Sequence, residues 1–123
     1  SVTLTRRDLI RYAGASGDFN VIHWDERAAV AVGLPDVIAH GMLTMGQALQ
    51  VVTDWLGDPG RILEYGVSFK RPVVVDALVG ATLQFAGKVQ SLDAGARTAV
   101  VEISATEDGQ AVLGRARATV QLA

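Results

Sequence analysis

Residues 41–56 read GMLTMGQALQVVTDWL, and this stretch decides the fold. Its side chains leave little polar face, and a helix that is apolar nearly all round is normally buried. The sequence therefore predicts a long buried helix that ends sharply at Gly57-Asp58-Pro59-Gly60. Gly46 lowers helix propensity by about 1 kcal/mol relative to alanine, so we expect it to mark a close backbone contact.

After residue 60 the apolar period becomes two, which is typical of half-buried antiparallel strands. Turns are expected at Asp93-Ala94-Gly95 and at Asp108-Gly109. The inward residues of the last strand are small (Gly114, Ala116 and Ala118), so the long helix is expected to pack against them. The predicted strands are 81–90, with Ala81, Leu83, Phe85, Gly87 and Val89 inward, then 98–106 and 114–122, and more weakly 61–71.

The first 60 residues show helical and loop patterns. Thr5 and Asp8 have the spacing of a capping box and predict a short helix near 6–14. Residues 14–22 have no helical pattern and are expected to form a loop. Trp24-Asp25-Glu26 opens a second short helix, which ends near Gly33. These patterns together predict one α+β domain over 1–123, a long helix wrapped by an antiparallel sheet.

Composition excludes several classes of function. The formal net charge of −2 gives no basic surplus for nucleic acid. The chain has no cysteine, which excludes disulfides, thiolate zinc sites and cysteine nucleophiles and suits the cytoplasm. No apolar run approaches the roughly 20 residues of a membrane helix, so no membrane insertion is expected. The chain begins at Ser1 rather than Met, so we expect it to be processed or cut from something longer.

Asp18 and His23 are the first candidate functional residues. They lie five residues apart in the glycine-containing predicted loop, with Asn20 between them. On a folded loop both side chains can point at one water molecule, and a carboxylate with an imidazole forms a plausible acid/base pair. Structural interpretations stay open, because Asp18 or Asn20 suits an Asx turn and either histidine suits a buried core position.

Gly41 begins the long helix directly after His40, the second histidine of the chain. The unpaired N–H groups at a helix N-terminus can polarise a carbonyl, and glycine allows close approach to them. The alternative is a tight turn at Gly41 with His40 as a cap. No histidine pair has metal-ligand spacing and no G-x-G-x-x-G follows a strand. Ser16 lacks a nucleophile-elbow context. The set therefore favours proton transfer next to a carbonyl, with gain or loss of water.

Residues 12–23, YAGASGDFNVIH, resemble the signature of the MaoC-like, or hydratase 2, family, with Ala29 at its closing small-residue position. Residues 38–43, IAHGML, resemble the second landmark of the family. WLGDPG at 55–60 is similar to the dehydratase subunits of mycolic-acid synthesis. The resemblance implies a hot-dog fold, a long central helix wrapped by a curved antiparallel sheet. It departs at Val21, where the family usually has proline, and at Ala15, where a larger aliphatic residue is usual.

The resemblance also implies an activity and a site. Family members add water to trans-2-enoyl thioesters or remove it from (3R)-hydroxyacyl thioesters, carried on CoA or acyl carrier protein. Asp18 and His23 would be the catalytic pair, the Gly41 N–H would bind the carbonyl oxygen, and Gly17, Asn20 and His40 would support the loop and substrate. No metal and no redox cofactor is implied. Relatives carry an extra strand before the position of Ser1.

Two other functions are alternatives to this one. A hot-dog subunit without activity would bind the acyl chain and stabilise a catalytic partner, but such a subunit is expected to lose Asp18 or His23. A hot-dog thioesterase typically has a carboxylate on the central helix, and residues 42–52 contain none. The resemblance is compatible with a homodimer and with a heterodimer.

Overall fold

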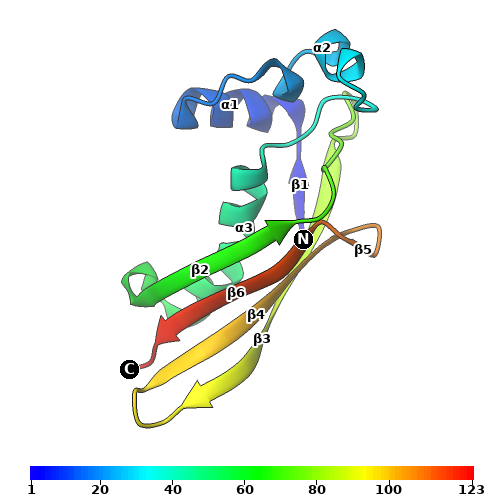
Figure 1. The fold of residues 1–123 in the computed structure, drawn as a ribbon. Helices are drawn as coiled ribbons and strands as arrows, with labels where there is room; N and C mark the ends of the chain where they lie inside the picture. The colour runs from blue at the N-terminus through cyan, green and yellow to red at the C-terminus, as the bar shows by residue number, and fades with distance from the viewer.

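A curved antiparallel sheet and one long helix, α3 (Gly41–Leu56), form the body of the protein in a computed structural model that describes residues 1–123 (Figure 1). The strand order is β1-β3-β4-β6-β2, and the short strand β5 pairs with β4 on the side of β6. This is the long helix wrapped by an antiparallel sheet that the sequence patterns predicted, and the hot-dog fold that the resemblance implied. The strands are β1 (Val2–Leu4), β2 (Ile62–Phe69), β3 (Ala81–Asp93), β4 (Thr98–Glu107), β5 (Gln110–Ala111) and β6 (Leu113–Gln121).

The predicted turns have the backbone that their residues favour. Asp108 and Gly109 both have positive φ (50° and 77°), as a tight hairpin between β4 and β5 requires. The Asp93 carboxylate accepts the N–H of Ala96 in the turn between β3 and β4. β1, in contrast, was not predicted, because three residues are too few to show a period.

The segment before α3 contains α1 (Arg6–Ser16), the 3₁₀ turn η1 (Val21–His23) and α2 (Glu26–Ala31). Thr5 and Asp8 form the predicted capping box at the start of α1. This helix runs two residues beyond the predicted end at residue 14, and Gly17 then terminates it in the left-handed conformation. Asp25 caps α2, which begins at Glu26. A second 3₁₀ turn, η2 (Pro59–Arg61), leads from α3 into β2.

Only one side of α3 is covered, which corrects the prediction of a helix buried all round. Thr44, Ala48 and Val52 are its buried residues and form one stripe at a spacing of four. This stripe faces the sheet, whereas Met42 and Trp55 are exposed. The apolar core lies between α3 and the inner face of the sheet and reaches the segments around it; its largest buried aliphatic residues are Leu4, Leu9, Val37, Val52, Val75, Leu83 and Val120.

Two glycines have surroundings that differ from the predicted ones. Gly46 makes no close backbone contact: a Cβ atom at this position would meet nothing within 4 Å. A Cβ on Gly114 would lie 2.5 Å from Cε of Lys70, so Gly114 makes room for the Lys70 stem rather than for the helix. Ala116 and Ala118 are buried as predicted, and α3 does contact β6.

One long edge of the sheet is open. β1 pairs only with residues 81–83 of β3, so the same edge of β3 carries no strand over residues 84–93. Gly87 and Val89, predicted to face inward, are exposed there, because α3 and the sheet do not enclose this end. The pairing of β3 with β4 shifts register between Val89 and Ser91, which indicates a β-bulge. None of the helices combines the length and apolarity needed to cross a bilayer.

Candidate active site

The structure brings Asp18 and His23 together. His23 Nε2 and Asp18 Oδ2 lie 3.9 Å apart, beyond direct hydrogen bonding. The side chain of His23 is 9% exposed, whereas that of Asp18 is 53% exposed and open to solvent. The pair therefore has one enclosed nitrogen base and one accessible carboxylate directed at the same place.

The loop that carries the pair is built from local hydrogen bonds. Asp18 Oδ1 accepts the N–H of Asn20 and Asn20 Oδ1 accepts the N–H of Ile22, at 3.2 Å each. Ser16 Oγ accepts the N–H of Asp18. The Asx-turn interpretation is therefore correct for Asp18 and Asn20, and it is compatible with the acid/base one. The turn uses Oδ1 of Asp18 and leaves Oδ2 facing His23.

The hydrogen bond at Nδ1 sets the tautomer of His23. This nitrogen lies 2.7 Å from the carbonyl oxygen of Ile38. A carbonyl oxygen can only accept, so Nδ1 carries the proton. In the neutral ring, Nε2 then has a free lone pair on the side of Asp18. The backbone of residue 38 thus prepares His23 to accept a proton.

His40 is buried against His23. The two imidazole rings stack with centroids 3.8 Å apart and planes 21° apart. His40 Nε2 donates to the carbonyl oxygen of Asp18 over 3.1 Å, and the ring of Tyr12 meets that of His40 edge-on. Burial lowers the pKa of His40, and repulsion from His23 acts in the same direction, against the hydrogen bond to Asp18. His40 therefore stays neutral at neutral pH.

The first residue of α3 leaves a backbone donor free. His40 occupies the N-cap position, as one of the alternatives expected, but its side chain makes no capping hydrogen bond. The N–H of Gly41 has no acceptor within the chain. A Cβ on Gly41 would lie 2.9 Å from the ring of Phe69, so only glycine fits here without displacing the ring.

Asp18, His23 and His40 have ligand atoms within 4.8 Å of one another. Their geometry does not suit a metal ion, however. The lone pairs of imidazole lie in the ring plane, and the planes of two stacked rings do not converge on a common point. His40 Nε2 and His23 Nδ1 are also engaged by carbonyl oxygens. We therefore treat Asp18 and His23 as a candidate acid/base pair, with His40 stacked against it.

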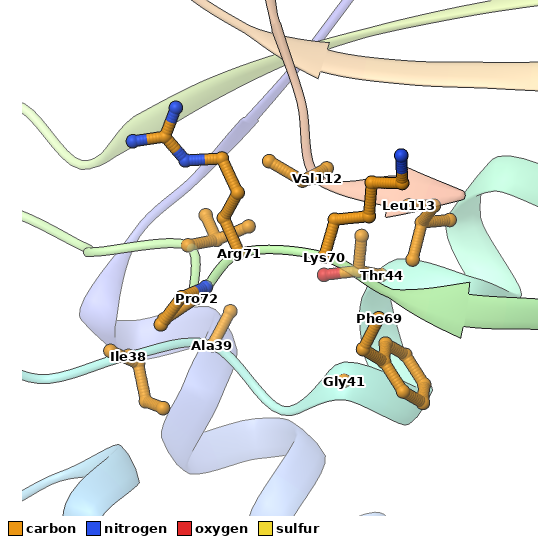
Figure 2. A pocket seen from close by; sticks show the side chains of 11 residues that line it. Ile38, Ala39, Gly41, Thr44, Phe69, Lys70, Arg71, Pro72, Val112 and Leu113 are labelled. Atoms are coloured by element: carbon orange, nitrogen blue, oxygen red, sulfur yellow. The ribbon is translucent and has the colours of Figure 1, made fainter.

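An apolar cavity of about 290 Å³ lies beside the start of α3 (Figure 2). Gly41 and Ala39 form part of its wall, and Lys70 and Arg71 extend from the strand end opposite. Asp18 and His23 do not line it, but both are hydrogen-bonded to the segment that does. His23 Nδ1 donates to the carbonyl oxygen of Ile38, and His40 Nε2 donates to that of Asp18. Its lining is Ile38, Ala39, Gly41, Thr44, Phe69, Lys70, Arg71, Pro72, Val73, Val112 and Leu113.

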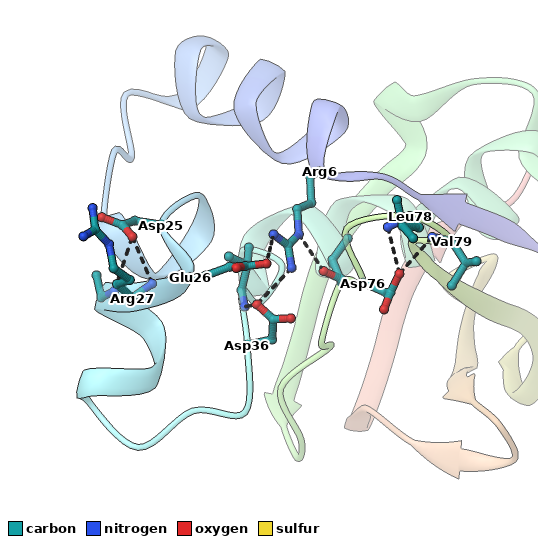
Figure 3. A network of polar contacts seen from close by, with 11 residues as sticks. Arg6, Asp25, Glu26, Arg27, Asp36, Asp76, Leu78 and Val79 are labelled. Atoms are coloured by element: carbon teal, nitrogen blue, oxygen red, sulfur yellow. Dashed lines mark hydrogen bonds and ion pairs between the residues drawn. The ribbon is translucent and has the colours of Figure 1, made fainter.

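Arg6 fixes the elements around the site to one another (Figure 3). Its Nε donates to the carbonyl oxygen of Val75 at 2.9 Å, and Nη1 donates to Glu26 at 2.7 Å. Nη2 forms an ion pair with Asp36 at 2.9 Å. Arg6 thereby ties the start of α1 to α2, to the segment before α3 and to the segment before β3.

The family model described as "MaoC like domain" matches residues 1–110. The chain belongs to this family. A curated relative named 3-hydroxyacyl-thioester dehydratase X, from Mycobacterium tuberculosis, is 39% identical over 77 residues, which is 63% of this chain and 26% of the relative. The (R)-specific enoyl-CoA hydratase of Rhodospirillum rubrum is 35% identical over 88 residues, which is 71% of this chain and 61% of the hydratase.

A solved structure described as a MaoC-like dehydratase superposes with a TM-score of 0.96 at 46% identity, covering 99% of this chain and 38% of that protein. The chain thus spans about a quarter of the dehydratase and less than two thirds of the hydratase it matches. Membership of the MaoC-like family supports a hydratase or dehydratase class of chemistry for this domain, which is the class that the resemblance implied.

Sequence reasoning placed Asp18, Asn20, His23, His40 and Gly41 in one region, and the structure places them there. It did not identify Lys70 and Arg71 at the cavity or the ring of Phe69 on Gly41. Phe69 ends β2, and Lys70 and Arg71 follow it, about 30 positions after Gly41. No local pattern connects the two segments. The run Phe69-Lys70-Arg71-Pro72, two cations between an aromatic residue and a proline, was the available signal.

Proposed function

We propose that this domain is a (3R)-specific hydro-lyase, which adds water to the C2–C3 double bond of an enoyl thioester or removes it from a 3-hydroxyacyl thioester. The observation that carries the proposal is the pairing of Asp18 and His23 at 3.9 Å, with His23 stacked on His40, the residue directly before Gly41 and its free N–H. Two acceptors and one donor are the minimum set for moving a proton next to a polarised carbonyl.

The pair suits the activation of one water molecule. Neutral His23 offers a lone pair at Nε2 and Asp18 offers an oxygen, so a water between them donates both of its protons. Its own lone pair is then free to attack C3. During hydration the water oxygen bonds to C3, the site takes a proton from that water, and C2 receives a proton. Dehydration reverses these steps. Either residue can take the proton, and the proposal assigns the step to the pair.

Gly41 would stabilise the charge that develops on the thioester oxygen. Withdrawal of a proton from C2 places negative charge on this oxygen, and a fixed N–H stabilises it without reorganisation. The N-terminus of a 16-residue helix adds a partial positive charge at the same point. The chemistry needs neither a metal nor a redox cofactor. We propose an acyl-CoA or an acyl carrier protein thioester as substrate, in keeping with the names of the relatives.

Loss of enoyl-thioester absorbance with crotonyl-CoA, and then with a long-chain enoyl-CoA, tests the activity. Asp18→Asn should lower kcat/KM roughly 10²- to 10⁴-fold, the usual contribution of a general acid or base. Asp54→Asn is the matched control, because Asp54 is an exposed acid on α3 without an ion pair. Turnover by Asp18→Asn at the level of Asp54→Asn would contradict the proposal.

We further propose that two hot-dog domains, identical or different, pair along β3. The unpaired edge over residues 84–93 offers backbone donors and acceptors to a second strand. Trp55 and Leu92 beside it are 55% and 69% exposed. An apolar cavity of about 290 Å³ opens at the same place, lined by Val51, Val52, Trp55, Gly87, Val89 and Val101. A second domain would cover both the edge and this surface.

A further inference from the structure

His40 is a buried titratable residue that the proposed chemistry does not use. Its residue surface is 1% exposed, and Nδ1 is buried without a hydrogen-bond partner. An unpartnered buried nitrogen costs free energy, and His40 does not compensate by capping α3. The partners of its imidazole ring are Asp18, His23 and Tyr12, two of which belong to the candidate site.

The first contact anchors the backbone of Asp18. His40 Nε2 donates to the Asp18 carbonyl oxygen at 3.1 Å, across 22 positions of sequence. The other hydrogen bonds of residues 16–20 join residues at most five positions apart. The bond from His40 is therefore the one hydrogen bond that fixes this loop to a distant part of the chain. It fixes the position of the Asp18 backbone, from which the carboxylate extends, relative to His23.

The second contact couples His40 to His23. Two imidazolium rings stacked at 3.8 Å repel each other, so a proton on one ring disfavours a proton on the other. The titratable groups that face His40 are His23, Asp18 and Tyr12. Of the two rings, only that of His23 has a carboxylate oxygen facing its free nitrogen. A proton arriving at the pair is thus better accommodated on His23.

We infer that His40 is a positioning residue, which fixes the Asp18 backbone with its Nε2–H and directs a proton taken up by the stacked pair to His23 rather than to its own ring. The inference rests on the proposed function for its kinetic consequence only. Burial of His40, which lowers its pKa, acts in the same sense. His40 donates no proton to the substrate, because its Nε2–H is engaged by the Asp18 carbonyl oxygen and its Nδ1 is buried.

Two substitutions separate the two parts of this role. His40→Gln keeps an N–H donor and loses the ring, whereas His40→Phe keeps a ring against His23 and loses the donor. We expect His40→Phe to lower kcat roughly ten- to a hundredfold with little change in KM, the size expected when a reacting group is misplaced. His40→Gln should recover most of this loss. Tyr12→Phe is the control, because it keeps the ring edge against His40.

The anchoring can also be measured without activity. The amide of Asn20 donates to Asp18 Oδ1, so its hydrogen exchange reports whether Asp18 stays in place. We expect exchange at Asn20 to accelerate in His40→Phe and to stay near the wild-type rate in His40→Gln. Equal exchange and equal kcat in all three proteins would overturn the anchoring role. Equal loss in both variants would do so too, because it would indicate a general requirement for packing.

Proton placement is tested by histidine NMR. The chain has two histidines, so each substitution removes one of two ring Cε1–H resonances. The resonance that His40→Gln removes should be the one that titrates at lower pH. In His23→Gln, the His40 resonance should titrate at higher pH than in the wild type, because the repulsion from His23 is gone. The opposite order, or no shift in His23→Gln, would overturn the coupling. Both NMR results stand if crotonyl-CoA is not hydrated, whereas absent turnover by the wild type counts against the proposed function alone.

Discussion

At its first residue α3 lacks a hydrogen-bond partner, whereas in its last turns it lacks apolar cover. The N–H of Gly41 has no acceptor within the chain although its neighbour His40 is buried. At the other end, Gly57 closes the helix with a bond to Thr53, yet Trp55 lies exposed. The two deficits call for different molecules, since a polar substrate atom satisfies the first and an apolar protein surface satisfies the second.

The largest expected effect concerns the first end. His23→Gln removes the base of the pair and should lower kcat/KM roughly 10²- to 10⁴-fold. Oligomeric state should not change, because the exposed face near Trp55 is untouched. Steady-state kinetics with crotonyl-CoA and sedimentation measure the two properties. A variant that dissociates as well as losing activity would show that the two ends are not independent.

The C-terminal end of α3 is tested by introducing a charge into its exposed apolar surface. Trp55→Asp places a carboxylate on the surface that we propose is covered, and burying an unpaired charge is costly. We expect the pair of domains to dissociate at concentrations at which the wild type is paired, as followed by analytical ultracentrifugation. Asp54→Asn, one position away, changes charge without touching the apolar surface and should leave pairing intact. A wild-type chain that stays monomeric at high concentration would contradict the proposed pairing of two domains.

A smaller effect is expected midway along the helix, where Tyr65 of β2 donates its hydroxyl to the Met45 carbonyl oxygen at 2.6 Å. Burial raises the pKa of Tyr65 to about 12, above the ordinary value near 10. The folded state therefore holds this proton more tightly than the unfolded chain. Stability from this group is complete below pH 10 and is lost as the pH rises toward 12. Tyr65→Phe should flatten that decline in chemical denaturation curves.

The smallest effect is expected at the helix end itself. Gly57 has φ of 74°, a conformation that costs other residues about 1 kcal/mol. Gly57→Ala should lower the free energy of unfolding by about that amount while kcat/KM stays at the wild-type level. Urea denaturation and the crotonyl-CoA assay would check both. A clear decrease of kcat/KM in a variant that remains folded would mean that a change in the last turn of α3 affects Gly41.

Local patterns predicted α3, four strands and two turns, because periodicity and turn residues act over a few positions. They also placed Asp18 near His23, since the two lie only five positions apart. The stack of His23 on His40 could not be predicted, because it depends on how the backbone of residue 38 meets η1. The exposure of Gly87 and Val89 was missed for another reason. Their alternation marks a surface suited to burial, but the rest of this chain does not cover it.

The β-bulge in β3 limits how such domains can assemble. A straight, open strand edge invites further strands on either side and leads toward fibres. The register shift between Val89 and Ser91 lies in the middle of the exposed edge, so an incoming strand meets a twisted template that few partners match. If the matching strand is another β3 in antiparallel orientation, the two β3 edges pair with each other and neither remains exposed. The assembly then closes at two domains, and a concentrated solution of the protein would stay clear rather than forming a gel.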